Sequence, residues 1–418
     1  MKDATLALHY GYDKDKQKSM QVPIYMTTAY EYESTRHAAK LFSLEDEGNI
    51  YTRIGNSTTE IFEKRIAVLE KGAGALAVAS GMAAIFYSLS NAAGNGDNVI
   101  LSDKLYGGSI TLGTQTLKRF GINAKYFDVH KPNTLLELID SHTKAILIES
   151  IANPALTVPE FETIAKIAHD KGVLLICDNT IATPYGVKPI TLGADIVVHS
   201  ASKYIVGNGS AIAGCIIESP KAKEKLVTDR YSHFNTPDES YHGLVYTKKF
   251  NTPFIARARL ALLRDFGAVI SPFNSWLLLQ GLEHLHLRVP RHSNSALEIA
   301  EFLQNHKKIK KVNYPLLKGD ENYEYAKKYL QYAGGIVSFE VEDYDTAEKI
   351  ANGLQIFSLV TNIGDSKSLV THPASTTHQQ LSKEELISAK VPEGLIRLSI
   401  GLEDVEDLIK DLDEALSK

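Results

Sequence analysis

The sequence predicts an α/β fold, with a mainly parallel central sheet and a smaller α+β C-terminal domain. Between about residues 72 and 218, short apolar runs alternate with amphipathic stretches, the pattern of parallel strands covered by helices on both faces. After about residue 255, a long helical region is followed by strands that stand far apart in the chain. The length of 418 residues leaves room for two or three domains.

The composition is that of an ordinary globular protein. Hydrophobic residues make up 44% and charged residues 23%, which excludes a largely disordered, collagen-like or coiled-coil chain. The net charge of −5 gives no global reason to bind nucleic acid or an anionic membrane. Two cysteines, Cys177 and Cys215, form no CxxC pair, which argues against a disulfide scaffold and fits a reducing cytoplasm.

Residues 1–55 are expected to form an irregular arm, and their charges leave no apolar core for a signal peptide. A helix is then expected from Ser57, because Ser57 and Glu60 have capping-box spacing and Gly72 suits the end. The uncharged stretch 72–96 is long enough to span a bilayer, but its glycines, serines and asparagines favour a buried strand, a turn and a buried helix.

The elements expected after this helix follow in order. Strands are expected at 75–80, 98–103, 124–129, 144–150, 173–178, 194–200 and 211–218, with helices at 82–94, 109–121, 133–141 and 161–172. The C-terminal part is expected to contain helices at 258–267, 275–306 and 404–418 and strands at 334–342 and 395–401. The predicted domains are therefore an arm (1–55), a large α/β domain (56–255) and a C-terminal domain (256–418).

Ligands of parallel α/β sheets bind at the carboxyl ends of the strands, so the residues just after each strand are the candidates. Lys203 follows the apolar run 196–198 and precedes several glycines. A buried unpaired ammonium is very costly, and one solution is a lysine that forms a Schiff base. The alternative is a lysine whose side chain extends to the surface.

Asp178 ends the apolar run 173–177, where a carboxylate needs a cation. A protonated pyridine nitrogen is one such partner, because the carboxylate keeps the ring an electron sink. The alternative is an aspartate that caps the next turn.

Other polar residues suggest further parts of a cofactor site, each with an ordinary structural alternative. Ser80-Gly81-Met82 lies between a strand and a helix, where backbone N–H groups bind phosphate, and Ser200 and Ser202 could add hydroxyls. Tyr106 could stack on a planar ring or be a core residue. Arg397, within an apolar strand, suggests recognition of a carboxylate or a buried salt bridge.

Other site types are not favoured. His372 and His378 stand six apart without acidic residues between them, so no metal site is expected. No GxGxxG or GxxxxGK[ST] motif occurs. Taken together, a Schiff-base lysine, a pyridinium partner, a phosphate cup, a stacking ring and a carboxylate-binding arginine describe a site for pyridoxal 5′-phosphate.

The chain also resembles a known family along almost its whole length. The matching motifs include VPIYMTTAY, GNIYTRIGNSTTEIFEKRIAVLE, AVASGMAA, ESIANPALTVPE, CDNTIATPYG, GADIVVHSASKY and NIGDSKSLVTHPASTTH. The family is the Cys/Met-metabolism group of fold-type I pyridoxal-phosphate enzymes, and the form of these motifs is similar to its O-acetylhomoserine sulfhydrylases.

The resemblance implies a role for each matching residue. It implies that Lys203 is the Schiff-base lysine, Asp178 the partner of the pyridine nitrogen, Tyr106 the ring-stacking tyrosine, and Arg397 the arginine for the substrate carboxylate. The implied phosphate cup comprises Ser80, Gly81, Met82, Ser200 and Ser202; Asn153 is placed near the cofactor 3′-oxygen, and Tyr51 and Arg53 reach the phosphate of a neighbouring subunit's cofactor.

Three positions depart from the family pattern. Ser202 replaces the usual threonine and keeps a hydroxyl, so phosphate binding is expected to survive. Asn208 replaces a common histidine without a clear consequence. Asn362, a candidate substrate-binding residue, stands where lyases and cystathionine synthases have serine, which favours the sulfhydrylases.

The resemblance implies a cytoplasmic homotetramer that makes L-homocysteine and acetate from O-acetyl-L-homoserine and a sulfur donor, free or on a carrier protein. Cystathionine γ-synthase and methionine γ-lyase activities remain alternatives on the same scaffold. Residues 200–203 also form the S-x-x-K of serine acyl-enzymes, but the S-D-N and K-T-G motifs of those enzymes are missing from the sequence.

Overall fold

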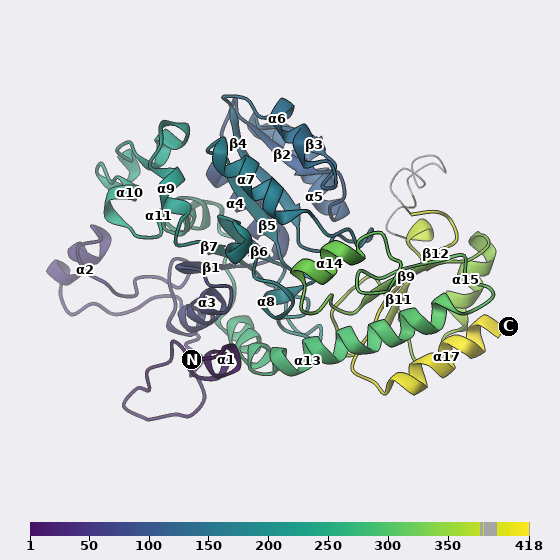
Figure 1. The fold of residues 1–418 in the computed structure, drawn as a ribbon. Helices are drawn as coiled ribbons and strands as arrows, with labels where there is room; N and C mark the ends of the chain where they lie inside the picture. Colours follow the sequence, from purple (N-terminus) through teal and green to yellow (C-terminus); the bar gives the residue numbers. More distant parts are fainter. Residues whose placement is uncertain (377–378, 380–390, 418) are drawn as a thin grey trace.

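The protein has two β-sheets, seen in a computed structural model that describes residues 1–376, 379 and 391–417 (Figure 1). The larger sheet has the strand order β1-β7-β6-β5-β4-β2-β3. All its strands run parallel except β7, which is antiparallel to both β1 and β6. Its strands are β1 (Gly74–Val78), β2 (Asn98–Ser102), β3 (Asn123–Phe127), β4 (Thr143–Glu149), β5 (Leu174–Asp178), β6 (Ile196–His199) and β7 (Gly214–Glu218).

The central strands are apolar along their whole length because both faces of the sheet are buried. In β5, Leu174 and Ile176 pack into one hydrophobic cluster, whereas Leu175 and Cys177 pack into the other. Helices cover both faces (Figure 1), so the predicted mainly parallel α/β fold is confirmed. The helices of this part are α3 (Ser57–Leu69), α4 (Gly81–Ala92), α5 (Gly107–Thr111), α6 (Leu135–Leu138), α7 (Phe161–Asp170), α8 (Thr183–Gly186), α9 (Ala222–Leu226), α10 (Tyr246–Lys249), α11 (Pro253–Arg257) and α12 (Arg264–Phe266).

Two expected helices are shorter or less regular than predicted. The helix expected over 109–121 begins as α5 but continues as a π-helical turn and a 3₁₀ turn, Leu112–Thr116 and Leu117–Phe120. Within the stretch 133–141, only α6 and part of a preceding 3₁₀ turn are helical, since the chain is extended again at Ile139.

The ends of α3 correct the predicted caps. The N-cap is Asn56, whose side chain accepts a hydrogen bond from Thr58 N at 3.0 Å, so Ser57 is already inside the helix. At the other end Gly72 N donates to Ala67 O and Lys71 N to Val68 O, the two bonds of a Schellman motif. The left-handed residue of this motif is Lys71, at φ 63°, rather than the expected Gly72.

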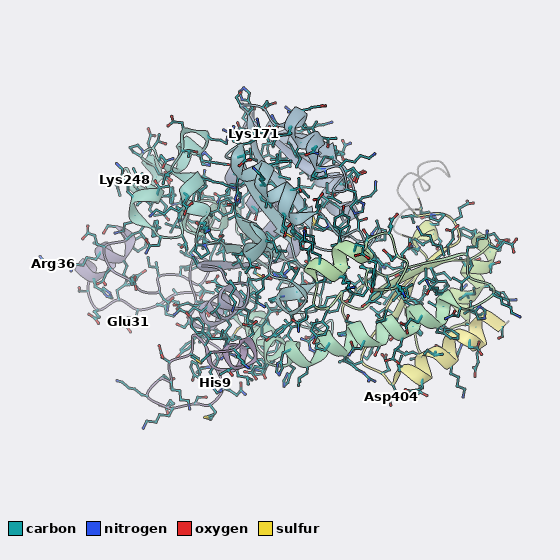
Figure 2. The ribbon with its side chains drawn as sticks, viewed as in Figure 1. His9, Glu31, Arg36, Lys171, Lys248 and Asp404 are labelled. Atoms are coloured by element: carbon teal, nitrogen blue, oxygen red, sulfur yellow. The ribbon has the colours of Figure 1, made fainter. Side chains whose placement is uncertain are left out.

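The N-terminal residues 1–55 contain two helices within the segment that was predicted to be irregular, α1 (Asp3–His9) and α2 (Thr35–Phe42). Helix α1 packs against α3 and the long helix α13 (Pro272–Gln304). Helix α2 stands away from the two sheets, at the far left of Figure 1. Figure 2 shows the same segment with Glu31 and Arg36 at its outer end.

The C-terminal part is built on the second sheet, with strand order β10-β11-β12-β9-β8. Helix α13 contacts α3 and α8 near one of its own ends and β8, β9 and α17 toward the other, so it runs alongside both parts (Figure 1). The remaining elements are β8 (Lys311–Asn313), α14 (Tyr323–Tyr329), β9 (Ile336–Glu340), α15 (Tyr344–Gly353), β10 (Ser358–Leu359), β11 (Leu369–Thr371), β12 (Leu395–Ser399) and α17 (Val405–Ser417).

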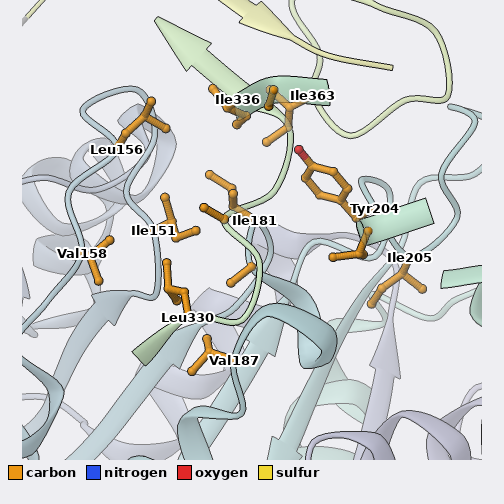
Figure 3. Close-up of a cluster of buried hydrophobic side chains, with 14 of the residues drawn as sticks. Ile151, Leu156, Val158, Ile181, Val187, Tyr204, Ile205, Leu330, Ile336 and Ile363 are labelled. Atoms are coloured by element: carbon orange, nitrogen blue, oxygen red, sulfur yellow. The ribbon is translucent and has the colours of Figure 1, made fainter. Parts of the chain in front are cut away.

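An apolar cluster joins the two sheets (Figure 3). It brings Ile151 and Ile181, which follow β4 and β5, against Ile363 and against Ile336 of β9. Tyr204 lies in the same cluster, and its hydroxyl accepts a hydrogen bond from Gly335 N at 2.8 Å. Loops of the large sheet are therefore fixed against the second sheet.

In the part of the chain that the structure describes, no helix combines the length and the apolar character needed to cross a membrane. The uncharged stretch 72–96 forms β1, a turn and α4, as expected. The domain limits at residues 55 and 255 stay predictions.

Candidate active site

A cavity of about 320 Å³ lies at the carboxyl ends of β4, β5 and β6. Loops from both halves of the chain enclose it, as expected for a ligand site of a parallel sheet. Most residues that the sequence selected line it, namely Ser80, Gly81, Met82, Tyr106, Asn153, Asp178, Ser200, Ser202, Lys203, Asn362 and Arg397.

Lys203 lies in the turn after β6 and has no acidic partner among the described residues. Its Nζ donates a hydrogen bond to Asn362 Oδ1 at 2.5 Å. Burial lowers the pKa of the Lys203 ammonium, and the positive charge of Arg397 lowers it further. The lowered pKa favours the neutral amine, the form that can bond to a carbonyl carbon and accept a proton.

Asp178 is the last residue of β5 and is 9% exposed. Its Oδ1 accepts two hydrogen bonds, from Thr180 N at 2.9 Å and Thr180 Oγ1 at 2.5 Å. Burial raises the pKa of the Asp178 carboxyl, whereas the Thr180 hydrogen bonds lower it. Oδ1 therefore caps the turn, as the structural alternative expects. Oδ2 accepts no hydrogen bond from a described residue, so it is available to a cation in the cavity.

Glu149 also lines the cavity and was not selected from the sequence. It ends β4 and pairs in register with Asp178 of β5. Like Asp178, Glu149 is an acid that ends an apolar strand, so the same local pattern indicates it. Other lining residues missed are Thr361 and the isoleucines Ile85, Ile151, Ile181, Ile212 and Ile363.

The start of α4 forms a cradle that fits a phosphate. Ser80 is its N-cap, with Oγ accepting a hydrogen bond from Ala83 N at 3.1 Å. A Cβ added at Gly81 would lie 2.5 Å from Ser200 Cβ, so only glycine allows this close approach. The N-terminal N–H groups of a helix attract anions, and Ser200 and Ser202 lie on the same cavity wall.

The Ser202 hydroxyl already has two partners on the chain. It accepts a hydrogen bond from Ala213 N at 2.9 Å and lies 3.1 Å from Ala213 O, to which it donates. Ser202 therefore fixes the loop before β7 against the cavity wall.

Tyr106 stands at the N-cap of α5 and is half exposed. A Cβ added at Gly108 would lie 2.6 Å from Tyr106 Cε1, so the glycine leaves room for the ring. The exposure of the ring at the cavity argues against a core tyrosine.

Arg397 lies in β12 and reaches the cavity from the second sheet. Its Nη1 donates to Asn153 Oδ1 at 3.0 Å, and its Nη2 donates to Asn362 O and Thr371 Oγ1, each at 3.3 Å. Among the described residues, Nε is buried without a hydrogen-bond partner and no carboxylate forms an ion pair with the side chain. In this part of the chain the structure therefore does not show the alternative of a buried salt bridge, and the guanidinium is available to a carboxylate ligand.

Tyr51 and Arg53 do not line the cavity of their own chain. Tyr51 is exposed, the Arg53 guanidinium lies 5.4 Å from the centre of its ring, and Arg53 donates a hydrogen bond to Arg264 O. Their predicted role toward another subunit stays a prediction.

No cluster of three metal-ligating side chains occurs among the described residues. His372 is hydrogen-bonded to Ser375 Oγ and to Glu393 O, at 3.0 Å and 2.7 Å. The other histidine of the rejected metal site, His378, lies outside the described residues.

A lysine, a buried carboxylate and a helix N-terminus at the strand ends of a parallel sheet define a pyridoxal-phosphate enzyme of the α/β class. Comparison with known proteins gives the particular family: the chain belongs to the Cys/Met metabolism PLP-dependent enzymes, whose family profile matches residues 4–417. Pyridoxal 5′-phosphate is therefore the cofactor, and membership excludes the serine acyl-enzyme alternative.

Relatives with similar sequences are known from bacteria and fungi. An O-acetyl-L-homoserine sulfhydrylase of Leptospira meyeri is 45% identical over 99% of this chain and 96% of that protein. A homocysteine synthase of Schizosaccharomyces pombe is 45% identical over 99% of this chain and 97% of that protein.

A solved structure has the same fold. It is a proposed O-acetylhomoserine (thiol)-lyase of Campylobacter jejuni, with a TM-score of 0.98 and 48% sequence identity over 100% of both chains. That structure contains N′-pyridoxyl-lysine-5′-monophosphate, an adduct of the cofactor with lysine.

Proposed function

We propose that the protein converts O-acetyl-L-homoserine and sulfide to L-homocysteine and acetate, a γ-replacement of methionine biosynthesis. The names of the full-length relatives support this substrate pair. The observation that carries the proposal is the cavity in which Lys203, Asp178 and Arg397 meet, because it provides an amine, a buried carboxylate and a carboxylate-binding guanidinium together.

The residues of the cavity suit each part of the bound cofactor. Lys203 is the residue that we propose to bond to it, and Asp178 would hold its ring nitrogen protonated. Ser80, Gly81, Met82, Ser200 and Ser202 would surround the phosphate, Tyr106 would stack on the ring, and Asn153 would lie near the 3′-oxygen. When bound, pyridoxal 5′-phosphate supplies an electron sink for the charge that develops when the substrate loses its α-proton.

Lys203 Nζ is the proposed proton carrier. Its lowered pKa suits removal of the α-proton and the later return of protons to the product. Arg397 would hold the substrate carboxylate through its guanidinium, with Asn362 beside both Arg397 and Lys203. Acetate then leaves from the γ-carbon, and sulfide takes its place. The Tyr106 hydroxyl would assist the departure of acetate.

Beyond a single chain, we propose a cytoplasmic homotetramer, a dimer of dimers. Tyr51 and Arg53 would then complete the phosphate site of a neighbouring subunit. Their position outside the cavity of their own chain supports this role. Free sulfide, a thiol and a sulfur-carrier protein are all compatible as donors, because the sulfur enters only after acetate has left.

The reaction is tested by incubating purified holoenzyme with three sets of substrates. O-acetyl-L-homoserine with sulfide should give homocysteine and acetate, whereas the same ester with cysteine, or methionine alone, should react far more slowly. Cystathionine as the main product, or rapid release of methanethiol from methionine, would replace the proposal with one of the two alternatives. Lys203→Ala should lose nearly all turnover, and Lys171→Ala, an exposed lysine, serves as the control.

A further inference from the structure

Glu149 has an arrangement that the proposed chemistry does not use. It is 7% exposed at the end of β4 and accepts one backbone hydrogen bond on each carboxylate oxygen. Oε1 accepts from Tyr106 N at 2.7 Å, and Oε2 accepts from Asn153 N at 3.0 Å. One buried side chain thus joins the loop that follows β2 to the loop that follows β4.

The two loops serve different parts of the site. Tyr106 presents the ring that lines the cavity, and Asn153 Oδ1 accepts a hydrogen bond from Arg397 Nη1 at 3.0 Å. A displacement of Glu149 would therefore shift both Tyr106, which we propose to contact the cofactor ring, and Asn153, which contacts the proposed carboxylate-binding Arg397.

A structural role alone does not explain an acid at this position. Glu149 forms no ion pair with a described residue, and it is next to Asp178 in the paired register. Burial and the charge of Asp178 raise the pKa of Glu149 well above its ordinary value, while its two N–H donors lower it. A carboxylate is therefore unfavourable for the fold here, but it offers a separate acceptor oxygen to each of the two donors, whereas an amide side chain has only one acceptor oxygen.

We propose that Glu149 is a positioning residue that holds Tyr106 and the Asn153–Arg397 pair in the arrangement that binds the cofactor ring and the substrate carboxylate. This inference deepens the proposed function and rests on it. In this arrangement, one buried side chain sets the distance between the two halves of the binding site.

Glu149→Gln tests the inference, because glutamine keeps the size but offers one acceptor in place of two. One of the two backbone N–H groups then faces an NH₂ group and loses its acceptor. If the loop moves away to restore a hydrogen bond, its contact with the ligand is lost, which corresponds to about 10- to 100-fold in binding. The dissociation constant of pyridoxal 5′-phosphate from the apoenzyme, the KM for O-acetyl-L-homoserine, or both should rise by this factor. The kcat at saturating cofactor and substrate should change by less than about threefold, because a loss of binding alone raises KM and leaves kcat unchanged.

Glu218→Gln is the matched control. Glu218 is also a buried acid at a strand end of the same sheet, with Oε2 accepting from Ile255 N at 2.9 Å. It pairs with Gly74 and Ile196, the first residues of β1 and β6, so it lies at the edge opposite the cavity. Its variant should leave cofactor binding and KM unchanged.

The inference is overturned if folded Glu149→Gln keeps both constants within about twofold of wild type, or if Glu218→Gln changes them equally. If Glu149→Gln does not fold, Glu149→Asp keeps the charge and both acceptors but withdraws them by one methylene, and the same two constants should rise. The cofactor constant needs no turnover, so an enzyme that makes no homocysteine would refute the proposed function and still decide this inference.

Discussion

Arg397 shows how a single side chain is kept ready for a ligand. Burial lowers its pKa to about 10, which leaves it cationic at neutral pH. The hydrogen bonds to Asn153, Asn362 and Thr371 are all to neutral oxygens, so no acid among the described residues competes with a substrate carboxylate. A planar guanidinium with a fixed orientation can bind that carboxylate through two nitrogens.

Arg397→Lys should therefore raise the KM for O-acetyl-L-homoserine by about 10- to 100-fold, since lysine is a point charge without the paired geometry. Steady-state kinetics at saturating sulfide measures it. Arg291→Lys is a suitable control, because Arg291 is exposed and pairs with Asp404 at 3.3 Å. An unchanged KM in Arg397→Lys would assign the substrate carboxylate to another residue.

Some residues of the site could be predicted from the sequence and others could not. Lys203 and Asp178 end long apolar runs, and Gly81 lies at a strand–helix turn, so each was selected by its local pattern. Glu149 was passed over although it has the same local pattern as Asp178. The hydrogen bond from Lys203 to Asn362 spans 159 positions, and no local pattern could indicate that contact.

Among the elements, α13 and β12 are linked by a buried histidine. His292 of α13 is fully buried, and its Nδ1 lies 2.7 Å from Ile400 O, which follows β12. Its Nε2 has no partner among the described residues. Burial lowers the pKa of His292 to about 4, with Arg288 lowering it further and Asp365 opposing it.

The stability of the fold should consequently depend on pH through His292. The folded pKa lies below the unfolded value of 6.5, so the contribution is complete above pH 6.5 and is lost as the pH falls toward 4, by about 3 kcal/mol. His292→Gln keeps an N–H donor but cannot titrate, so its thermal midpoint should fall less than that of wild type between pH 7 and pH 4. Parallel pH profiles of the two proteins would refute this explanation.

The elements that the sequence predicted are those whose pattern is long and repeated. The strands of the large sheet are continuous apolar runs because both their faces are covered, and α17 has a regular apolar stripe. Strands β8, β10 and β11 were missed because they have only 3, 2 and 3 residues. Their existence depends on pairing with distant strands, such as β12, rather than on their own residues.

At the scale of the whole molecule, the part of the N-terminal segment that carries α2 projects away from the two sheets (Figure 1). Met20, Met26 and Phe42 are 77%, 67% and 60% exposed on the N-terminal segment. A second copy of the chain that covers this segment would bury these side chains and receive Arg53 at its cofactor site.

Subunit complementation tests this arrangement. Arg53→Ala and Lys203→Ala should each be nearly inactive alone, because each site needs both residues. Co-expression should restore about a quarter of wild-type activity, since half of the dimers are hybrids with one complete site of two. Absence of recovery, with hybrids confirmed by two different affinity tags, would place Arg53 and Lys203 in the same subunit's site or in separate roles.

Trapping the cofactor by reduction shows directly which lysine of the chain it is bonded to. The yellow holoenzyme is reduced with borohydride, digested and analysed by peptide mass spectrometry. We expect one phosphopyridoxyl group, attached to Lys203 in the peptide that follows β6. Modification of a different lysine, or complete recovery of the unmodified Lys203 peptide from a reduced holoenzyme, would contradict it.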